Sequence, residues 1–374
     1  MLSEEALDRI VDDVKRRFSK RPRVAIAGFG KAGKSSLFNA IYGEDVAAVS
    51  MRTDETAVSQ TKERFGIDLT DTPGFGTGRF SLDEVAKSGA LDEQHVVIHV
   101  LNGMSAISAE DMQLHRILEG SVAHRITVVN KADLLDDREK AELAQSAREL
   151  LGLDEKELLF VSARRRTGIE ELVDRIVEAL PDAMRDAFIA QQQGDLALKD
   201  RRIRTLIYSK AGVAAAIGAI PLPFADLALL APLQVAMVVT IGHFQGVEVS
   251  RARAVELIAT LGAGVGFREG ARQLLKLVPG FGSAVGGAVA FAGTVALGET
   301  ARVWFRRKQQ VGVDELRETF RQAAEEARAE AKAMLADVPI RELERLRVKL
   351  DAGEITEEEF HRAVTALGDR ESEA

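Results

Sequence analysis

The spacing of apolar residues changes several times along the chain. Between residues 22 and 180, short apolar runs typical of buried strands alternate with longer segments whose apolar residues recur every three or four positions. This alternation predicts a mostly parallel β-sheet covered by helices on both faces. The strands are expected at Val24–Ala27, Ile67–Asp71, His95–Leu101, Ile126–Asn130 and Leu158–Val161. Ligands of such sheets bind beyond the carboxyl ends of the strands.

The flanks of this α/β region carry helical patterns only. Residues 1–21 are predicted to form an amphipathic N-terminal helix that packs on the α/β region. Its apolar stripe consists of Leu7, Ile10, Val11, Val14 and Phe18. Residues 181–200 lose the strand pattern, and we expect a linker helix there.

The remaining chain is predicted to be all helical. Residues 201–310 are rich in Ala, Gly, Leu and Val, with turn signals at 221–223 and 279–282, which predicts two helical hairpins. Residues 311–374 have the pattern of a charged helical tail. In this tail Thr356 and Glu359 have the spacing of a capping box, which starts a helix.

Charge supports the same division. The net charge of −8 is uneven, because residues 201–310 hold 13 basic and 5 acidic residues whereas residues 311–374 hold 10 basic and 17 acidic ones. The chain has no cysteine, so disulfides, thiolate metal sites and cysteine nucleophiles are excluded. The N-terminal residues are acidic where a signal peptide needs a basic start, so we expect a cytoplasmic protein that is not exported.

A glycine-rich segment lies between the first predicted strand and the following helix. It comprises Gly28, Phe29, Gly30, Lys31, Ala32, Gly33, Lys34, Ser35 and Ser36. In this position glycines let backbone amides surround phosphate groups, and the helix N-terminus adds positive potential. Lys34 is expected to contact the β- and γ-phosphates, and the Ser35 hydroxyl to bind Mg²⁺. The motif alone predicts a nucleoside triphosphate.

A second motif, Asp-Thr-Pro-Gly at residues 71–74, ends the second predicted strand. From there the Asp71 carboxylate can hold a water molecule of the Mg²⁺ shell, and the Gly74 amide can point at the γ-phosphate. Such a tetrapeptide is common in turns, so its position after the phosphate loop gives it weight.

Two further motifs predict which base is bound. Asn130, Lys131 and Asp133 follow the fourth predicted strand, and the Asp133 carboxylate can accept two hydrogen bonds from guanine that adenine cannot donate. Lys131 would cover the base plane, and Asn130 would tie this loop to the phosphate loop. Ser162 and Ala163 follow the last strand and can present a backbone amide to guanine O6.

With these four motifs in order, residues 22–180 resemble an Era-like GTPase of the translation-factor class. The resemblance implies binding of GTP and GDP, Mg²⁺ as cofactor, and hydrolysis of GTP. It also implies a metal-binding threonine in the first switch, where Thr53, Thr56 and Thr61 are the candidates. We choose Thr56, so that Ser35, Thr56 and Asp71 form the expected metal set. Lys34, Thr56, Gly74 and Lys31 are the expected catalytic residues.

Two positions depart from better-known GTPases. Phe75 stands where Ras-like GTPases have the glutamine that orients the attacking water, so we expect slow hydrolysis until another group or subunit completes the site. Lys31 stands where potassium-stimulated relatives have asparagine. Its ammonium could occupy the position of the potassium ion, which predicts no potassium stimulation. The alternative is an ordinary solvated loop lysine.

The apolar middle region allows two interpretations, membrane contact or a purely soluble helical domain. Its longest uncharged run, residues 277–298, contains Pro279 and Gly280, and Gly282 to Gly286 is a small-residue face suited to close helix packing. Basic and aromatic residues at both ends favour an anionic membrane surface. They are Arg201, Arg202, Arg204, Lys210, Arg302, Trp304, Phe305, Arg306, Arg307 and Lys308.

Two more resemblances complete the prediction. Residues 205–310 are similar to an uncharacterised helical domain that follows the G domain in a group of bacterial GTPases. The stretch around Gly353 to Phe360 resembles a short C-terminal helical module that mediates assembly in other proteins; the alternative is two solvated helices. The expected architecture is an α/β P-loop G domain with a mostly parallel sheet, an apolar helical-hairpin domain and a charged helical tail.

The expected function is a GTP-hydrolysing switch coupled to self-association or to membrane contact. The alternatives are a dynamin-type membrane-remodelling GTPase and, ranked last, a ribosome-assembly GTPase. The last would need an exposed RNA-binding module, whereas here the basic region is also the most apolar one, so we expect no nucleic-acid partner. Expected partners are guanine nucleotide, a second copy of the chain and an anionic membrane surface, which would place the protein at the cytoplasmic face of the inner membrane.

Overall fold

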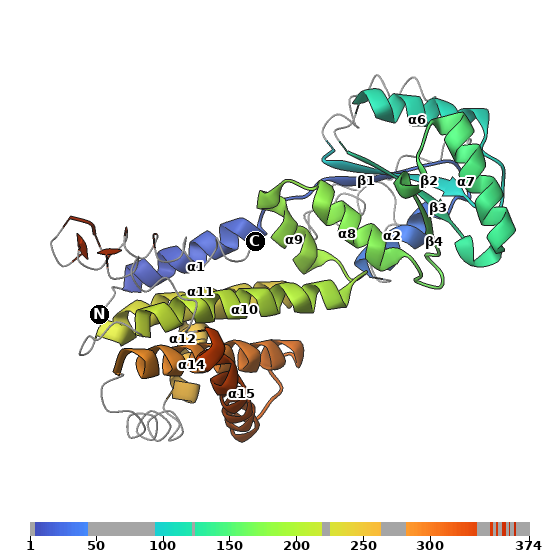
Figure 1. The fold of residues 1–374 in the computed structure, drawn as a ribbon. Helices are drawn as coiled ribbons and strands as arrows, with labels where there is room; N and C mark the ends of the chain where they lie inside the picture. Colours follow the sequence, from blue (N-terminus) through green and yellow to red (C-terminus); the bar gives the residue numbers. More distant parts are fainter. Residues whose placement is uncertain are drawn as a thin grey trace. The chain divides into compact units, whose positions relative to one another are not determined.

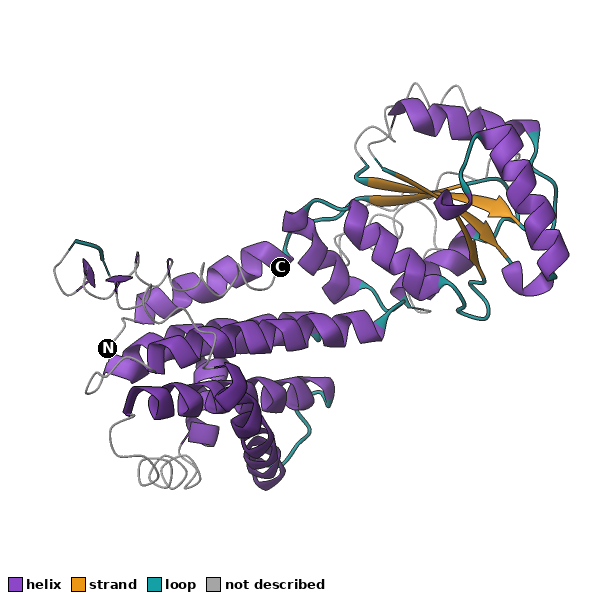
Figure 2. Ribbon diagram, in the orientation of Figure 1, coloured by secondary structure: helices purple, strands orange, loops and turns teal. Residues whose placement is uncertain are grey.

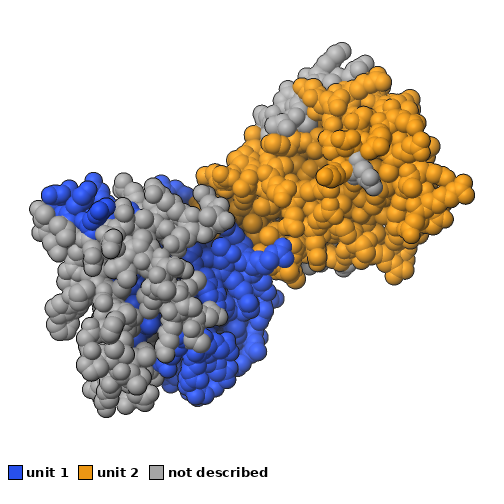
Figure 3. Space-filling view, viewed as in Figure 1, with its two compact units in different colours: residues 1–16, 200–374 blue, residues 17–199 orange. Residues whose placement is uncertain are grey.

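The computed structural model describes residues 4–43, 94–121, 124–218, 225–262 and 282–334, together with short pieces between 345 and 363. The chain divides into two compact units (Figure 3). We call residues 17–199 the sheet unit and residues 1–16 with 200–374 the helical unit. The division runs through the last turn of helix α1 and the first turn of helix α10.

The described part of the sheet unit contains one parallel sheet of four strands in the order β1-β2-β3-β4 (Figure 1). The strands are β1 (Val24–Ala27), β2 (Val96–Asn102), β3 (Arg125–Asn130) and β4 (Leu158–Val161). All three pairings are parallel, with Ala27 opposite His99 and Asn102 opposite Asn130. The four strands were predicted to within one residue at each end, and the fifth prediction, Ile67–Asp71, lies outside the described residues.

Helices cover both faces of this sheet, as the alternating pattern predicted (Figure 2). The helices are α2 (Lys34–Tyr42), α6 (Ala109–Ser121), α7 (Asp137–Leu151), α8 (Ile169–Ala179) and α9 (Asp182–Gln191). Apolar residues of α2, α8 and α9 share one core with inward-facing strand residues. Leu114 and Leu118 of α6 pack on the opposite face against β1 and β2, and Leu151 of α7 packs beside β3 and β4. Short 3₁₀ turns lie at Ala132–Leu134 and Glu155–Glu157.

Helix α9 lies in the segment predicted as a linker helix, residues 181–200, and the division between the units falls at the end of that segment. Its Phe188 is fully buried in the core of the sheet unit, with its ring centroid 6.0 Å from that of Tyr42. Burying a phenyl ring contributes about 2 kcal/mol, so α9 is held to the sheet unit by packing. The loss of strand pattern therefore comes shortly before the end of the sheet unit at residue 199.

Helix α1 (Glu4–Phe18) forms where the N-terminal helix was expected, but its packing differs. Residues 4–16 belong to the helical unit, so the prediction that this helix packs on the α/β region is wrong. Val11 and Val14 are buried. Arg251 forms ion pairs with Glu4 and Asp8, both at 3.0 Å. The acidic side chains of α1 are thus paired with Arg251, which lies far from them in the sequence.

Helices alone form the described part of the helical unit (Figure 1). They are α10 (Leu196–Gly218), α11 (Ala225–Phe244), α12 (Arg251–Gly262), α14 (Gly282–Arg306) and α15 (Val313–Met334). These helices stand where two hairpins and a charged tail were predicted, and both predicted turns lie outside the described residues. Of the helices described, none has the length and apolarity needed to cross a bilayer.

Helices α10 and α14 pack against each other in antiparallel orientation. At two points of contact, glycines allow the helices to approach closely. A Cβ atom at Gly218 would lie 2.7 Å from the carbonyl oxygen of Gly286, and a Cβ at Gly298 would lie 2.6 Å from Ile207. Any larger side chain at these positions would force the helices apart. The small-residue pattern that ends at Gly286 therefore serves helix packing in this unit.

The aromatic and basic residues at the end of α14 correct another expectation. Trp304 is 6% exposed and Phe305 is 1% exposed, so both rings lie inside the helical unit. The Arg253 guanidinium lies over the Trp304 ring, 4.8 Å from its centroid. The position of Trp304 and Phe305 beside basic residues favoured a membrane surface. Because both rings are buried in the core of the helical unit, this argument for membrane contact fails.

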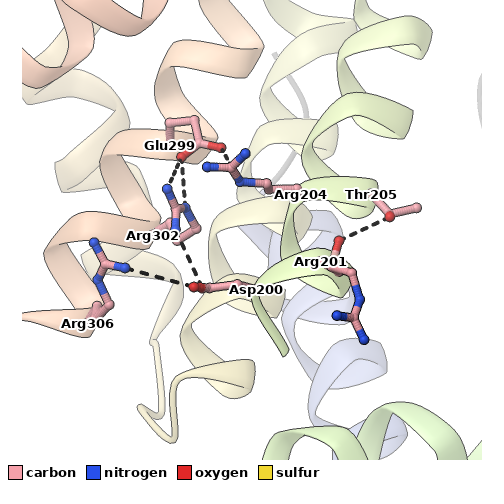
Figure 4. Close-up of polar contacts among 7 residues, drawn as sticks. All are labelled: Asp200, Arg201, Arg204, Thr205, Glu299, Arg302 and Arg306. Atoms are coloured by element: carbon pink, nitrogen blue, oxygen red, sulfur yellow. Dashed lines mark hydrogen bonds and ion pairs between the residues drawn. The ribbon is translucent and has the colours of Figure 1, made fainter. Parts of the chain in front are cut away.

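A cluster of ion pairs joins the N-terminal part of α10 to the C-terminal part of α14 (Figure 4). The Arg302 side chain, only 10% exposed, lies 2.7 Å from Glu299 and 3.4 Å from Asp200. Two more arginines extend the cluster. Arg306 lies 3.9 Å from Asp200, and Arg204 lies 4.0 Å from Glu299. Arg302 is thus a nearly buried cation whose charge is balanced by two carboxylates, which keeps its burial from costing several kcal/mol.

The acidic tail adds apolar contacts to the helical unit. Leu346, Leu350 and Ile355 pack against a cluster that includes Ile217 and Leu233. The capping box predicted at Thr356 is confirmed, because Glu359 N donates to Thr356 Oγ1 at 3.2 Å and Thr356 N donates to Glu359 Oε2 at 2.9 Å. The tail is therefore not simply a pair of solvated helices.

We expect Arg302→Ala to destabilise the helical unit by about 2 kcal/mol, because it leaves two carboxylates without their shared partner in a largely buried site. The matched control is Arg321→Ala on α15, whose side chain is 60% exposed beside Glu318 and whose removal should change stability far less. Urea unfolding followed by Trp304 fluorescence measures this unit alone, since the chain has a single tryptophan. Equal effects of the two substitutions would contradict the prediction.

Candidate nucleotide-binding site

The phosphate loop lies between the end of β1 and the start of α2. Lys31 and Gly33 have left-handed backbone conformations, with φ of 63° and 88°, and α2 begins at Lys34. A Cβ at Gly28 would lie 2.4 Å from the carbonyl oxygen of Val100, so only glycine fits there. Lys34 Nζ donates to the carbonyl of Phe29 at 3.3 Å, which folds its side chain back over the loop. The loop surrounds a helix N-terminus, where backbone amides favour an anion.

The Asn130 side chain joins this loop to both loops predicted to contact the base. Its Nδ2 donates to the carbonyl of Ala32 at 2.9 Å and to that of Gly33 at 3.4 Å. Its Oδ1 accepts a hydrogen bond from Ala163 N at 3.1 Å. Asn130 is 2% exposed, so these bonds are shielded from water. The predicted tie between the base loop and the phosphate loop is confirmed.

The Asp133 carboxylate is exposed to solvent in the loop that follows β3. Lys131, with φ of 67°, precedes the 3₁₀ turn Ala132–Leu134 that carries it. A hydrogen bond from the Ser162 side chain holds the pKa of Asp133 below its usual value, with smaller contributions from Arg165 and Arg164. Asp133 is therefore ionised at neutral pH, in the state that can accept hydrogen bonds from guanine.

Part of the predicted site falls in residues 44–93, outside those described. These are the switch threonines Thr53, Thr56 and Thr61, and the residues Asp71, Gly74 and Phe75. Among the predicted metal ligands, Ser35 is described: it is half-buried in the first turn of α2, beside the phosphate loop. A hydroxyl oxygen in that position suits a hard cation such as Mg²⁺.

Sequence reasoning missed Arg166, in the loop after β4. This exposed residue has a left-handed conformation, with φ of 59°, and its guanidinium donates to the carbonyl of Gln193 at 2.8 Å. A non-glycine residue with positive φ is uncommon, but no motif in the sequence marks it. The only signal was the run of three arginines at 164–166.

Two buried histidines of the sheet unit were also missed. His99 on β2 and His115 on α6 are 0% and 2% exposed, with their Nδ1 atoms 3.4 Å apart. Burial, with smaller contributions from His115 and Arg125, lowers the pKa of His99 to about 3. Burial also lowers the pKa of His115. Both rings are neutral at pH 7, so they serve packing and carry no charge toward the nucleotide loops.

Comparison with known proteins gives two adjacent family matches. Residues 23–131 match the family described as 50S ribosome-binding GTPase, and residues 190–329 match a domain of unknown function, DUF697. The first covers the phosphate loop through Lys131. The second begins in α9 and ends in α15, so it covers most of the helical unit.

Individual relatives agree with the first match. GTPase Der of Kosmotoga olearia is 34% identical over 166 residues, which are 41% of this chain and 38% of Der. GTPase Era of Carboxydothermus hydrogenoformans is 32% identical over 166 residues, 42% of this chain and 55% of Era. The probable GTP-binding protein EngB of Streptococcus agalactiae is 30% identical over 173 residues, 42% of this chain and 86% of EngB.

This chain spans 38% and 55% of those Der and Era relatives, so the similarity concerns the sheet unit. Among solved structures, a probable GTP-binding protein EngB has a TM-score of 0.32 at 20% identity, covering 42% of this chain and 97% of that chain.

The sheet unit, with a phosphate loop after β1 and base-contacting loops after β3 and β4, is a P-loop G domain. The chain belongs to the family of small GTPases that includes Era, Der and EngB. The resemblances predicted for residues 22–180 and for the helical domain after them are confirmed.

Proposed function

We propose that this protein is a GTP-hydrolysing switch whose nucleotide state is coupled to self-association through the helical unit. The observation that supports it best is the position of Asn130, whose buried side chain joins the phosphate loop to the loop at Ala163. Both ends of a bound nucleotide would then contact one connected framework. A domain of unknown function follows directly, as expected if the nucleotide controls something beyond its own hydrolysis.

In this proposal the described residues bind and orient the nucleotide. Lys34 and the loop amides of Gly28 to Ser36 hold the β- and γ-phosphates, and Asp133 accepts the guanine hydrogens. Ser35, with Thr56 and Asp71, would hold Mg²⁺, which neutralises charge on the phosphates. The Gly74 amide would contact the γ-phosphate. These assignments follow from the motifs and from the family.

Lys31 is proposed as an additional cation for catalysis. It is exposed in the phosphate loop, and its left-handed backbone is an uncommon conformation for a residue with a side chain. Strain of this kind costs about 1 kcal/mol and concentrates at functional sites. An ammonium beside the β- and γ-phosphates would stabilise the charge that develops as the bond between them breaks. Turnover would then need no potassium.

Membrane contact, including a dynamin-type remodelling activity, remains an alternative way to use the helical unit. Burial of Trp304 and Phe305 takes away the aromatic anchors that first supported it. Exposed arginines such as Arg201 and Arg202 still offer positive charge to an anionic surface. We place the protein in the cytoplasm and, under this alternative, at the cytoplasmic face of the inner membrane.

A second candidate is association with the large ribosomal subunit. The description of the family that matches residues 23–131 favours it, since that description names 50S binding. Sequence analysis ranked it last because the basic region is apolar and the tail is acidic. Under this candidate the subunit, rather than a second copy of the chain, would complete the catalytic site.

The decisive measurement is GTP turnover by the full chain over a wide range of protein concentrations. We expect specific activity to rise with concentration, because Phe75 cannot orient the attacking water and a second copy must supply what is missing. Parallel assays with anionic liposomes and with purified 50S subunits separate the alternatives. Lys34→Ala measures any contaminating activity. A low, flat rate with concentration would sink the self-association proposal.

The base assignment predicts the effect of Asp133→Asn. Loss of two charge-assisted hydrogen bonds should weaken GTP binding by about 100-fold or more, and binding of xanthosine triphosphate should improve. Asp137→Asn is the matched control, because Asp137 is also exposed but lies in the first turn of α7. Titration with fluorescent nucleotides measures the dissociation constants for GTP and for xanthosine triphosphate. Unchanged preference for guanine in Asp133→Asn would refute the assignment.

The role of Lys31 is tested by two substitutions. Lys31→Ala should slow turnover about tenfold to a hundredfold while changing GTP affinity little, because the cation acts on the developing charge. Lys31→Asn should make turnover depend on potassium over sodium. Lys156→Ala, which removes another exposed lysine of the G domain, is the control. Turnover that is unaffected in Lys31→Ala would show an ordinary solvated lysine.

A further inference from the structure

The turn at residues 192–195, between α9 and α10, is closed by hydrogen bonds and has two buried residues, Gln192 and Asp195. The Gln192 side chain spans it, since its Nε2 donates to the Asp195 carbonyl at 2.6 Å and its Oε1 accepts from Asp195 N at 2.7 Å. Asp195 Oδ1 accepts from Leu198 N at 2.7 Å, which caps the first turn of α10. Gln192 and Asp195 are 0% and 2% exposed. The start of α10 is therefore rigidly joined to this turn.

Both backbone groups of Gln193 in this turn are bonded to elements that form the nucleotide site. Its N–H donates to the carbonyl of Ile41 at 2.7 Å, and its carbonyl accepts from Arg166 at 2.8 Å. Ile41 lies in the last turn of α2, whose first residue is Lys34. Arg166 lies in the loop that begins with Ser162. One residue thus contacts the phosphate side and the base side of the site.

The connection on the phosphate side is a single helix, and the connection on the base side is a loop with two anchors. Helix α2 has nine residues, about 13 Å at 1.5 Å per residue, so a displacement at the phosphates reaches Ile41 through a single helix. The loop at 162–167 is closed by a hydrogen bond from Ser162 N to the Thr167 carbonyl at 2.9 Å. Its other anchor is the bond between Ala163 N and Asn130. The Arg166 backbone therefore follows the base loop.

At Gly194 the turn packs tightly against α8. A Cβ atom at Gly194 would lie 2.8 Å from Val173 Cγ2 and 3.0 Å from Ile169 Cγ2, both on α8. Tight packing of this kind transmits strain rather than relaxing it. The element that remains to respond is α10, whose residues after 199 belong to the helical unit.

We propose that the 192–195 turn transmits the state of both ends of the bound nucleotide to α10, with Arg166 as the positioning residue on the base side. The inference rests on the proposed function, because it needs GTP and GDP to bind differently. It names the connection through which the switch would act. Arg166 contacts the turn through a hydrogen bond and is not a catalytic residue.

The test is hydrogen exchange of the full chain with GDP and with a non-hydrolysable GTP analogue, followed by mass spectrometry of peptides from residues 196–218. The wild type should show a nucleotide-dependent difference in exchange rate there. Arg166→Ala should reduce that difference about fivefold, the equivalent of about 1 kcal/mol for one hydrogen bond, while analogue affinity stays nearly unchanged. Arg166→Lys, which keeps a donor, should restore most of it.

Arg138→Ala is the matched control, because it removes an exposed arginine of the sheet unit that lies on α7 and is not the donor to Gln193. It should leave the difference intact. A wild type that binds both nucleotides without any difference in α10 overturns the inference alone, as does a full difference in Arg166→Ala. Absence of nucleotide binding in the wild type overturns the proposed function as well.

Discussion

The buried Asn130 side chain is the constraint on which the geometry of the nucleotide site depends. Its amide fills a space between loops that come from three strands, and it uses both its donor and its acceptor groups to bond them. A Cβ at Gly33 would lie 2.4 Å from Asn130 Nδ2, so the phosphate loop can approach only because that position is glycine. The loops are therefore not independent, and a change at either end of the nucleotide must be accommodated by the same side chain.

The helical unit is held together by a different means. Its apolar composition allows close contact between helices, because glycines at 218, 286 and 298 remove the side chains that would separate α10 from α14. At the other end of the same helix pair, the ion pairs between Arg302 and Asp200 and between Arg204 and Glu299 join α14 to α10 and favour one register. Apolar packing alone permits helices to slide, whereas a nearly buried cation with two partners is satisfied in a single alignment. Ala- and Gly-rich helices with charged ends are thus explained by packing within the unit.

The sequence predicted what depends on local spacing and on motifs with a fixed chemistry. The four described strands, the phosphate loop and Asn130 fall in this class, because residue period and strand–loop–helix order determine them locally. The sequence did not predict which part of the molecule packs against a given apolar face. The pattern at residues 4–18 shows an apolar face but not which unit covers it, and Trp304 beside arginines has the same sequence pattern at a membrane edge as inside a core. Arg166 and the 192–195 turn carry no motif, since backbone hydrogen bonds to Gln193 place no demand on residue type.

In the proposed function, slow hydrolysis and the 192–195 turn serve the same purpose. A GTPase that hydrolyses rapidly by itself holds its GTP state too briefly to report it, whereas Phe75 in place of a water-orienting glutamine implies slow intrinsic turnover. A long-lived GTP-bound state can act as a signal only if another part of the chain responds to it. Ile41, at the end of the helix that follows the phosphate loop, and Arg166, in the loop after β4, both bond to the backbone of Gln193, two residues before the residue that caps α10. In the proposed function, slow hydrolysis would keep the GTP state long enough for the 192–195 turn to pass it to α10, and a switch requires both.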